Sequence, residues 1–151
     1  RGGGAAMKMG LELLEEMERS NIEVDVYTLT SFINTAKQDG SPHAIATAYG
    51  MFQSASIHTR RSTRVYATMI SALGRASFVD EAEQLLDDAL SIGVTPDVFM
   101  YGAAMQAVAD RARDAAGEQR VRRLHARMLA QGIADSEVTR RIMSRLLRRP
   151  Y

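Results

Sequence analysis

A recurrence of about 35 residues restricts the possible folds of this chain more than any other feature of its sequence. Residues 66–70 and 101–105 stand in equivalent settings, and each begins an apolar stripe that is followed by a turn and a second stripe. These two units end near Gly93 and Gly132, which tolerate the positive φ of a helix stop. Residues 26–60 fit the same template. A fixed period of this length is typical of repeat architectures, so we expect a stack of similar units.

The apolar residues within each unit recur at intervals of three and four, which predicts two amphipathic helices per unit. The predicted stripes are Leu29, Phe32, Ile33 and Ala36 with Ile45, Ala48, Tyr49 and Phe52; Tyr66, Met69, Ile70 and Leu73 with Ala82, Leu85, Leu86, Ala89 and Leu90; and Tyr101, Ala104, Met105 and Val108 with Val121, Leu124 and Met128. One helix pair cannot cover these stripes alone. Stacked neighbours can, because each pair buries its apolar side against the next.

Several polar residues stand where helices are expected to begin. Asp97 precedes the third unit as an N-cap, and Ser41 precedes Pro42, which suits the first position of a helix. Ser77, with Asp80 three residues later, resembles a capping box in which Asp replaces the usual Glu. We therefore predict helix starts at all three places.

These signals divide the chain into five segments of one continuous domain. The predicted segments are 1–25, the second half of a preceding repeat; 26–62, a repeat with two extra residues, Arg61 and Ser62; 63–97, a repeat; 98–136, a repeat with a short insertion around residues 113–119; and 137–151, the first helix of a following half-repeat. This division predicts about eight helical segments at most.

The residues that could support catalysis are few and scattered. The chain has no Cys, which excludes thiol nucleophiles and Cys-ligated metals. His43, His58 and His125 have no partners at metal-ligand spacing, and the adjacent carboxylates 15–16 and 87–88 point about 100° apart on a helix. No apolar run reaches the length of a membrane span. We therefore expect no enzyme activity, no cofactor, no metal and no small-molecule substrate.

The charge is unevenly distributed along the chain. Residues 1–110 carry eight Lys or Arg against fourteen acids, whereas residues 111–151 carry eleven Arg against four. Arg141, Arg145 and Arg148 fall in the last predicted helix, and they either contact the phosphates of a nucleic acid or form a solvated face. An apolar end with Leu146, Leu147 and Tyr151 exposed would favour a protein partner.

The repeat unit has further features besides its period. An aromatic residue lies near the start of its first helix, an alanine near the start of the second, and Pro-Asp closes it at residues 96–97. In these features the chain resembles pentatricopeptide repeat proteins, most closely over residues 63–97 and least over 98–136. Tetratricopeptide repeats, with a period of 34 residues, are the nearest alternative. They are placed second because the chain lacks their Trp and their Leu-Gly-x-x-Tyr pattern.

The resemblance implies an all-α, right-handed α-solenoid of antiparallel helix-turn-helix repeats, with single-stranded RNA along the first helices. It also implies that two positions per repeat select the base: the residue after the first-helix aromatic and the last residue of the repeat. On this chain these positions are Thr30 with Arg60 or Ser62, Ala67 with Asp97, Gly102 with Ser136, and Arg141 in the last half-unit. Together with Arg145 and Arg148, these residues are the candidate RNA contacts.

These residue pairs allow little selection between RNA bases. Thr30 is the one favourable residue at the first position and Asp97 the one favourable residue at the second, and they belong to different repeats. Ala67 and Gly102 have no side-chain hydrogen-bonding group. We therefore predict an organellar, mitochondrial or plastid, protein that associates with single-stranded or ribosomal RNA with little sequence selectivity. The alternative is a scaffold or accessory subunit of a large organellar complex, such as a ribosome or an energy-transducing membrane complex.

Overall fold

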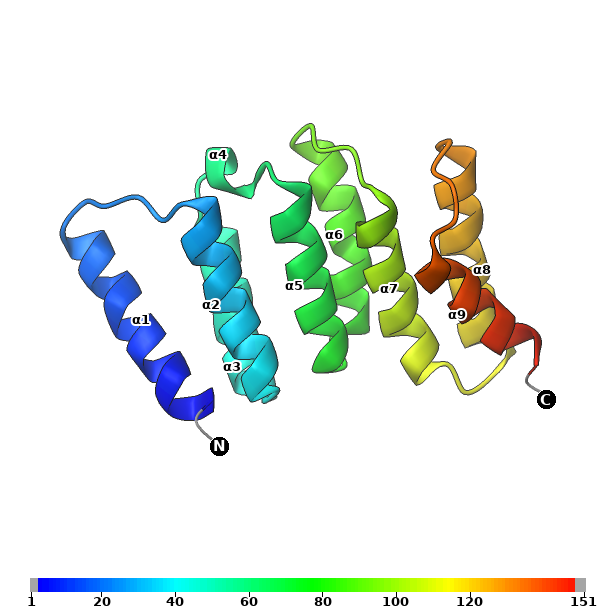
Figure 1. The fold of residues 1–151 in the computed structure, drawn as a ribbon, viewed down its shortest axis with the longest axis horizontal. Coiled ribbons are helices and arrows are strands. Elements are labelled where there is room, and N and C mark those ends of the chain that lie inside the picture. The colour runs from blue at the N-terminus through cyan, green and yellow to red at the C-terminus, as the bar shows by residue number, and fades with distance from the viewer. Residues whose placement is uncertain (1–2, 149–151) are drawn as a thin grey trace.

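The computed structural model describes residues 3–148, and this range is all-helical (Figure 1). Its nine helices are α1 (Gly3–Arg19), α2 (Val26–Asp39), α3 (Pro42–Ser54), α4 (Ile57–Arg60), α5 (Thr63–Arg75), α6 (Val79–Ser91), α7 (Val98–Arg111), α8 (Ala115–Ala130) and α9 (Glu137–Leu147). The described range contains no strand. The predicted all-α class is thus confirmed.

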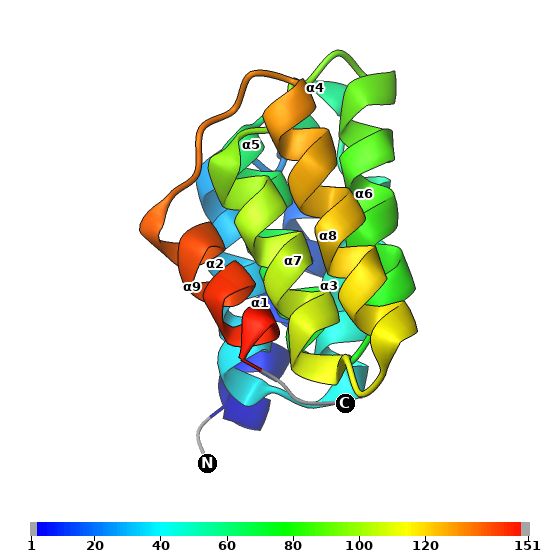
Figure 2. The same cartoon turned by 90° about the vertical axis from the view of Figure 1, so that its right-hand side faces the viewer.

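The helices form a solenoid of two layers. Helices α2, α5, α7 and α9 lie side by side in one layer, and α3, α6 and α8 lie behind them in the other (Figures 1 and 2). Helix α1 packs against α2 at the N-terminal end of the stack. We call the exposed surface of α2, α5, α7 and α9 the first-helix face.

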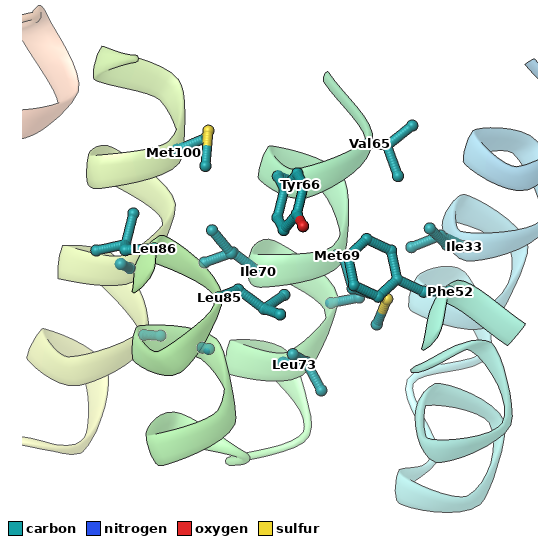
Figure 3. Packing of buried hydrophobic residues seen from close by; sticks show 14 of the residues in the cluster. Ile33, Phe52, Val65, Tyr66, Met69, Ile70, Leu73, Leu85, Leu86 and Met100 are labelled. Atoms are coloured by element: carbon teal, nitrogen blue, oxygen red, sulfur yellow. The ribbon is translucent and has the colours of Figure 1, made fainter. Parts of the chain in front are cut away.

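The apolar core runs without a break from one repeat into the next. Tyr66 and Tyr101, the aromatic residues of two successive first helices, are both fully buried. In Figure 3, Phe52 of α3 lies beside Tyr66 of α5, and the two rings meet edge to face with their centroids 5.1 Å apart. Because the contact joins the second helix of one repeat to the first helix of the next, neither repeat completes its core alone.

Local capping explains most of the helix ends. Asp97 accepts a hydrogen bond from the backbone N–H of Met100 at 2.9 Å, and Ser41 accepts one from Ala44 at 3.1 Å. Gly93 and Gly132 follow α6 and α8 with φ of 84° and 80°, a conformation that favours glycine. The N-caps predicted at Asp97 and Ser41 and both glycine stops are therefore confirmed.

The capping box predicted at Ser77 and Asp80 is wrong. Ser77 has a φ of 69° and belongs to the turn that closes α5, where the N–H of Phe78 donates to the Leu73 carbonyl at 2.9 Å. The N-cap of α6 is Phe78, which provides no side-chain hydrogen bond. The Ser77 hydroxyl oxygen instead accepts a hydrogen bond from Arg111 Nε at 2.8 Å, so a contact with the next repeat replaces the expected cap.

A short extra helix, α4, lies at the end of the first predicted repeat, just before the extra residues Arg61 and Ser62, so the prediction of at most eight helices is wrong. Ser56 caps α4, and Ser62, one of the two extra residues, caps α5. The hydroxyl of Thr59 donates to the Val24 carbonyl at 2.9 Å, and that of Ser56 donates to Glu23 at 2.8 Å. These bonds tie α4 to the segment between α1 and α2.

The predicted stripes hold except at a few positions. Leu90 is 43% exposed and Tyr49 is only partly buried. At the other end of the chain, Leu147 is exposed as expected, whereas Leu146 is buried, because α9 packs that side against the continuous core. Tyr151 lies outside the described residues. The extra residues of the third unit lengthen its second helix, since α8 has 16 residues and α6 has 13.

Candidate nucleic-acid interface

Two aromatic side chains project into solvent from equivalent positions in the first layer. Tyr27 and Phe99 lie two residues after the N-caps Asp25 and Asp97, and they are 81% and 72% exposed. The corresponding residue of α5 is Arg64, which is also exposed. Aromatic rings and guanidinium planes are the groups on which unpaired bases stack, and stacking does not depend on the identity of the base.

A hollow of about 380 Å³ opens on the first-helix face. It is lined by residues of four helices, among them Lys37 of α2, Ser71 and Arg75 of α5, Gly102 and Gln106 of α7, and Val138 of α9. The hollow is deep because small residues, Gly74 and Ala107, lie where α5 meets α7. A Cβ at Gly74 would lie 2.6 Å from the Cβ of Ala107, so α5 and α7 are in direct contact there. The hollow therefore lies over the closest approach of two first helices.

Lys37 and Arg75, two cations from successive repeats, border the hollow. Burial and the nearby charge of Arg75 lower the pKa of Lys37 from its ordinary value. Within the described residues, neither Lys37 nor Arg75 has an acidic side chain at ion-pair distance. Asp110, the acid of the same lining, is itself paired with Arg145, so a phosphate would relieve the repulsion between Lys37 and Arg75.

The candidate base-selecting residues lie in different surroundings. Gly102 lines the hollow, and Ala67 is partly buried on α5. Thr30 is buried, and its hydroxyl donates to the Val26 carbonyl at 2.7 Å. Arg60 belongs to α4 and lies 5.9 Å from the Phe52 ring, in a second hollow that α3 shares with α6. These four residues therefore differ in burial, and Gly102 and Arg60 border different hollows.

The candidate residues at the repeat ends are helix caps. The Asp97 carboxylate caps α7, and Ser136 caps α9 through a capping box with Thr139. Ser62, the other option for the end of the first repeat, caps α5. A cap uses one side-chain oxygen, so the second Asp97 oxygen is still available to a ligand.

The C-terminal arginines of α9 are partly neutralised. Arg141 pairs with Glu137 at 3.2 Å, and Arg145 pairs with Asp110 of α7 at 3.6 Å. Arg148 is exposed at the C-terminal end of the helix. Arg145 is linked to the hollow through its partner Asp110, which is part of the lining.

Two arginines of α8, Arg120 and Arg127, face acids of α6 in the second layer. Arg120 pairs with Glu83 and, at 2.7 Å, with Asp80, and Arg127 pairs with Asp87 at 2.6 Å. The acidic charge of the second repeat thus offsets part of the basic charge of the third. The charge asymmetry along the sequence is smaller in space than along the chain.

Lys37, Arg75, Gln106 and Asp110 are not among the site residues predicted from the sequence. A basic residue in the last turn of a helix is also what the helix dipole favours, so Lys37 and Arg75 carried no distinct signal. Gln106 and Asp110 are four residues apart on α7, as many solvent-exposed polar pairs are. Only the stacking of α2, α5 and α7 brings these four residues to one hollow.

Residues 3–148 hold no group of three His, Cys, Asp or Glu side chains that could bind a metal ion. None of the helices in that range combines the length and apolar character needed to cross a lipid bilayer.

Comparison with known families gives two matches. Residues 12–51 match the profile of the pentatricopeptide repeat domain, and residues 64–94 match that of the PPR repeat. A search among curated proteins finds no match. Proteins with these repeats are typically RNA-associated and generally act as non-enzymatic adaptors. The matched ranges span α1 to α6, and with the stacked helix pairs they show that the chain belongs to the pentatricopeptide repeat family.

Proposed function

We propose that this protein binds single-stranded RNA along its first-helix face, with little sequence selectivity at the two code positions of the family. The observation that carries the proposal is the pair of cations without acidic partners, Lys37 and Arg75, beside the hollow. Tyr27 and Phe99 add exposed rings on which bases can stack. A basic surface with interleaved aromatic side chains is the usual design of a single-strand binder.

The low selectivity follows from the state of the code residues. Thr30 already uses its hydroxyl proton, and Ala67 and Gly102 offer no side-chain hydrogen bond. One good bidentate contact to a base edge discriminates by about 1–3 kcal/mol. Asp97 keeps a second carboxylate oxygen and Arg60 an unpaired Nε, but the two belong to different repeats, so sequence reading at these positions is weak.

The proposal is tested by measuring the affinity of a short single-stranded RNA over a series of salt concentrations. We expect the Lys37→Gln/Arg75→Gln variant to bind more weakly and to flatten the slope of log K against log[salt] by about 1.4, since each phosphate contact contributes about 0.7. Arg19→Gln/Arg123→Gln is the matched control, because both arginines are exposed and lie outside the hollow. An unchanged slope in the first variant would refute the proposed interface.

The candidate contacts of α9 form a separate arm of this experiment. If Arg141, Arg145 and Arg148 also contact phosphates, their replacement by Gln lowers the slope further. If these arginines form a solvated face, their replacement leaves the slope of log K against log[salt] unchanged. Because Arg141 and Arg145 already have acidic partners, we expect a smaller effect per residue than for Lys37 and Arg75.

A second candidate function is that of a scaffold or accessory subunit in a large organellar complex, either a ribosome or an energy-transducing membrane complex. The exposed leucines Leu129 and Leu147, at 46% and 70%, favour it. We place the protein in a mitochondrion or plastid, as is typical of the family. Sedimentation of the native protein before and after ribonuclease treatment separates an energy-transducing complex from an RNA-dependent setting. A large complex that survives ribonuclease favours the former, and one that collapses favours RNA binding or a ribosome.

A further inference from the structure

The hollow on the first-helix face contains a polar pair on α7 as well as the two cations. Gln106 Nε2 donates to Asp110 Oδ1 at 2.6 Å, and both residues line the hollow. This bond uses one of the two amide protons of Gln106. The amide oxygen of Gln106, its second N–H and the other carboxylate oxygen of Asp110 remain for a ligand.

The Gln106–Asp110 pair follows Gly102, a code position that has no side chain, along the same face of α7. Gln106 follows Gly102 by four residues, so the two stand one above the other on the same face of α7. A Cβ at Gly102 would meet only Thr139 and Val138, each at 3.8 Å, so packing does not require glycine here. Because Gly102 has no side chain, the surface of α7 between its first turns and Gln106 is left uncovered.

We propose that the hollow is a pocket for a single RNA base, and that Gln106 with Asp110 selects a base whose Watson–Crick edge has an exocyclic amino group beside a ring-nitrogen acceptor, namely adenine or cytosine. This inference rests on the proposed RNA-binding function. The hollow, at about 380 Å³, is large enough, since ligand pockets begin at about 300 Å³. Lys37 and Arg75 border it and would hold the phosphates on either side of the base.

The donor and acceptor pattern supports this choice of base. The amide oxygen of Gln106 accepts from the amino group, and its free N–H donates to the ring nitrogen, as in the bidentate pairing of glutamine with adenine. Uracil presents a carbonyl where adenine and cytosine present the amino group. Asp110 has a cationic neighbour in Arg145 at 3.6 Å, but its own oxygens still repel a nearby carbonyl oxygen and attract an amino group.

The test compares oligoadenylate, oligocytidylate and oligouridylate of equal length, with affinities measured by fluorescence anisotropy. We expect the wild-type protein to bind the first two at least about fivefold more tightly than the third, the smallest preference that one bidentate contact gives. Gln106→Ala should reduce this ratio toward that of uniform binding. Gln84→Ala, at an exposed glutamine on α6 outside this hollow, is the matched control and should preserve the ratio.

A second variant tests the part played by the negative charge. Asp110→Asn keeps the size of the side chain and should raise oligouridylate affinity relative to oligoadenylate. A base preference that survives in Gln106→Ala, or no preference in the wild type, would overturn the inference while leaving RNA binding intact. Failure of all three oligonucleotides to bind would overturn the proposed function and the inference together.

Discussion

Single residues without large side chains set the spacing of the first layer. Gly74 lets α5 approach α7 until a Cβ at this position would collide with Ala107, and Gly102 leaves the hollow open. Gly50, in the middle of α3, has no atom within 4 Å of where its Cβ would lie. Glycines in similar helical settings therefore have different roles, and only the neighbouring helix distinguishes them.

This difference predicts opposite effects of the same substitution. Gly74→Ala should lower the free energy of unfolding by about 1–3 kcal/mol, because the new methyl group forces α5 and α7 apart. Gly50→Ala should raise it by up to about 1 kcal/mol, because alanine favours the helix and meets no neighbour. Urea denaturation followed by circular dichroism measures both. A neutral Gly74→Ala would mean that the two helices are not in contact.

The Asp135 carboxylate provides a test of pH dependence at the same scale. Although burial opposes the shift, hydrogen bonds from Thr139 and His125 lower the pKa of Asp135 below its ordinary 3.8. The stabilisation is therefore present above pH 3.8 and is lost as the pH falls through the lower folded pKa. Asp135→Asn should flatten the decline of stability between about pH 5 and pH 2.

The urea midpoint at each pH measures this effect. Glu12→Gln, which removes an exposed carboxylate on α1, is the control and should follow the wild-type curve. If the Asp135→Asn and wild-type curves run parallel, the hydrogen bonds at Asp135 do not stabilise the folded state.

At the scale of elements, the starts of the first helices are defined by local caps. Asp25, Ser62, Asp97 and Ser136 each accept a hydrogen bond from the backbone three residues later. These caps recur at the joints between repeats, so the start of each first helix can be recognised from short polar residues. Ser77 shows that such recognition can fail. This residue is suited to capping a helix, but it lies in the turn that ends α5 and binds Arg111.

The dual position of Asp97, as a cap and as a code residue, yields a prediction for α7. Asp97→Ala should cost about 1 kcal/mol of stability, whereas Asp97→Ser should keep most of it, because serine caps equally well. Thermal unfolding compares the two variants. If both lose the same stability, the cap is not what stabilises the start of α7. RNA affinity measured on the serine variant then reports base contact apart from helix stability.

At the scale of the whole molecule, stability comes from the unbroken core between repeats. Leu85 is 2% exposed in the central repeat, and Leu90 on the same helix is 43% exposed. Every repeat shares its apolar surface with a neighbour, so damage to the central one should weaken the whole stack.

Leu85→Ala should therefore lower the free energy of unfolding by about 2–5 kcal/mol, since it opens a cavity between helices. Leu90→Ala is the control with the same change in chemistry, and it should cost clearly less because the side chain is already half in solvent. Chemical denaturation of both variants measures the two losses of unfolding free energy. Equal losses would show that the register of α6 is wrong.

The sequence by itself determined the elements of this protein and their recurrence. Apolar residues at helical spacing, caps such as Asp97 and stops such as Gly93 act over a few residues, so they are visible without a fold. The same local signals missed α4, because a single helical turn is too short to show a periodic apolar pattern.

Only the tertiary structure decided which polar residues share a surface. Lys37, Arg75 and Gln106 are spread over 70 positions of the chain, and stacking alone brings them to one hollow. Stacking also placed the arginines of α8 against the acids of α6 and buried the hydroxyl of Thr30. A helix pattern shows which side of a helix is apolar, but the neighbouring repeats determine what each polar side chain meets.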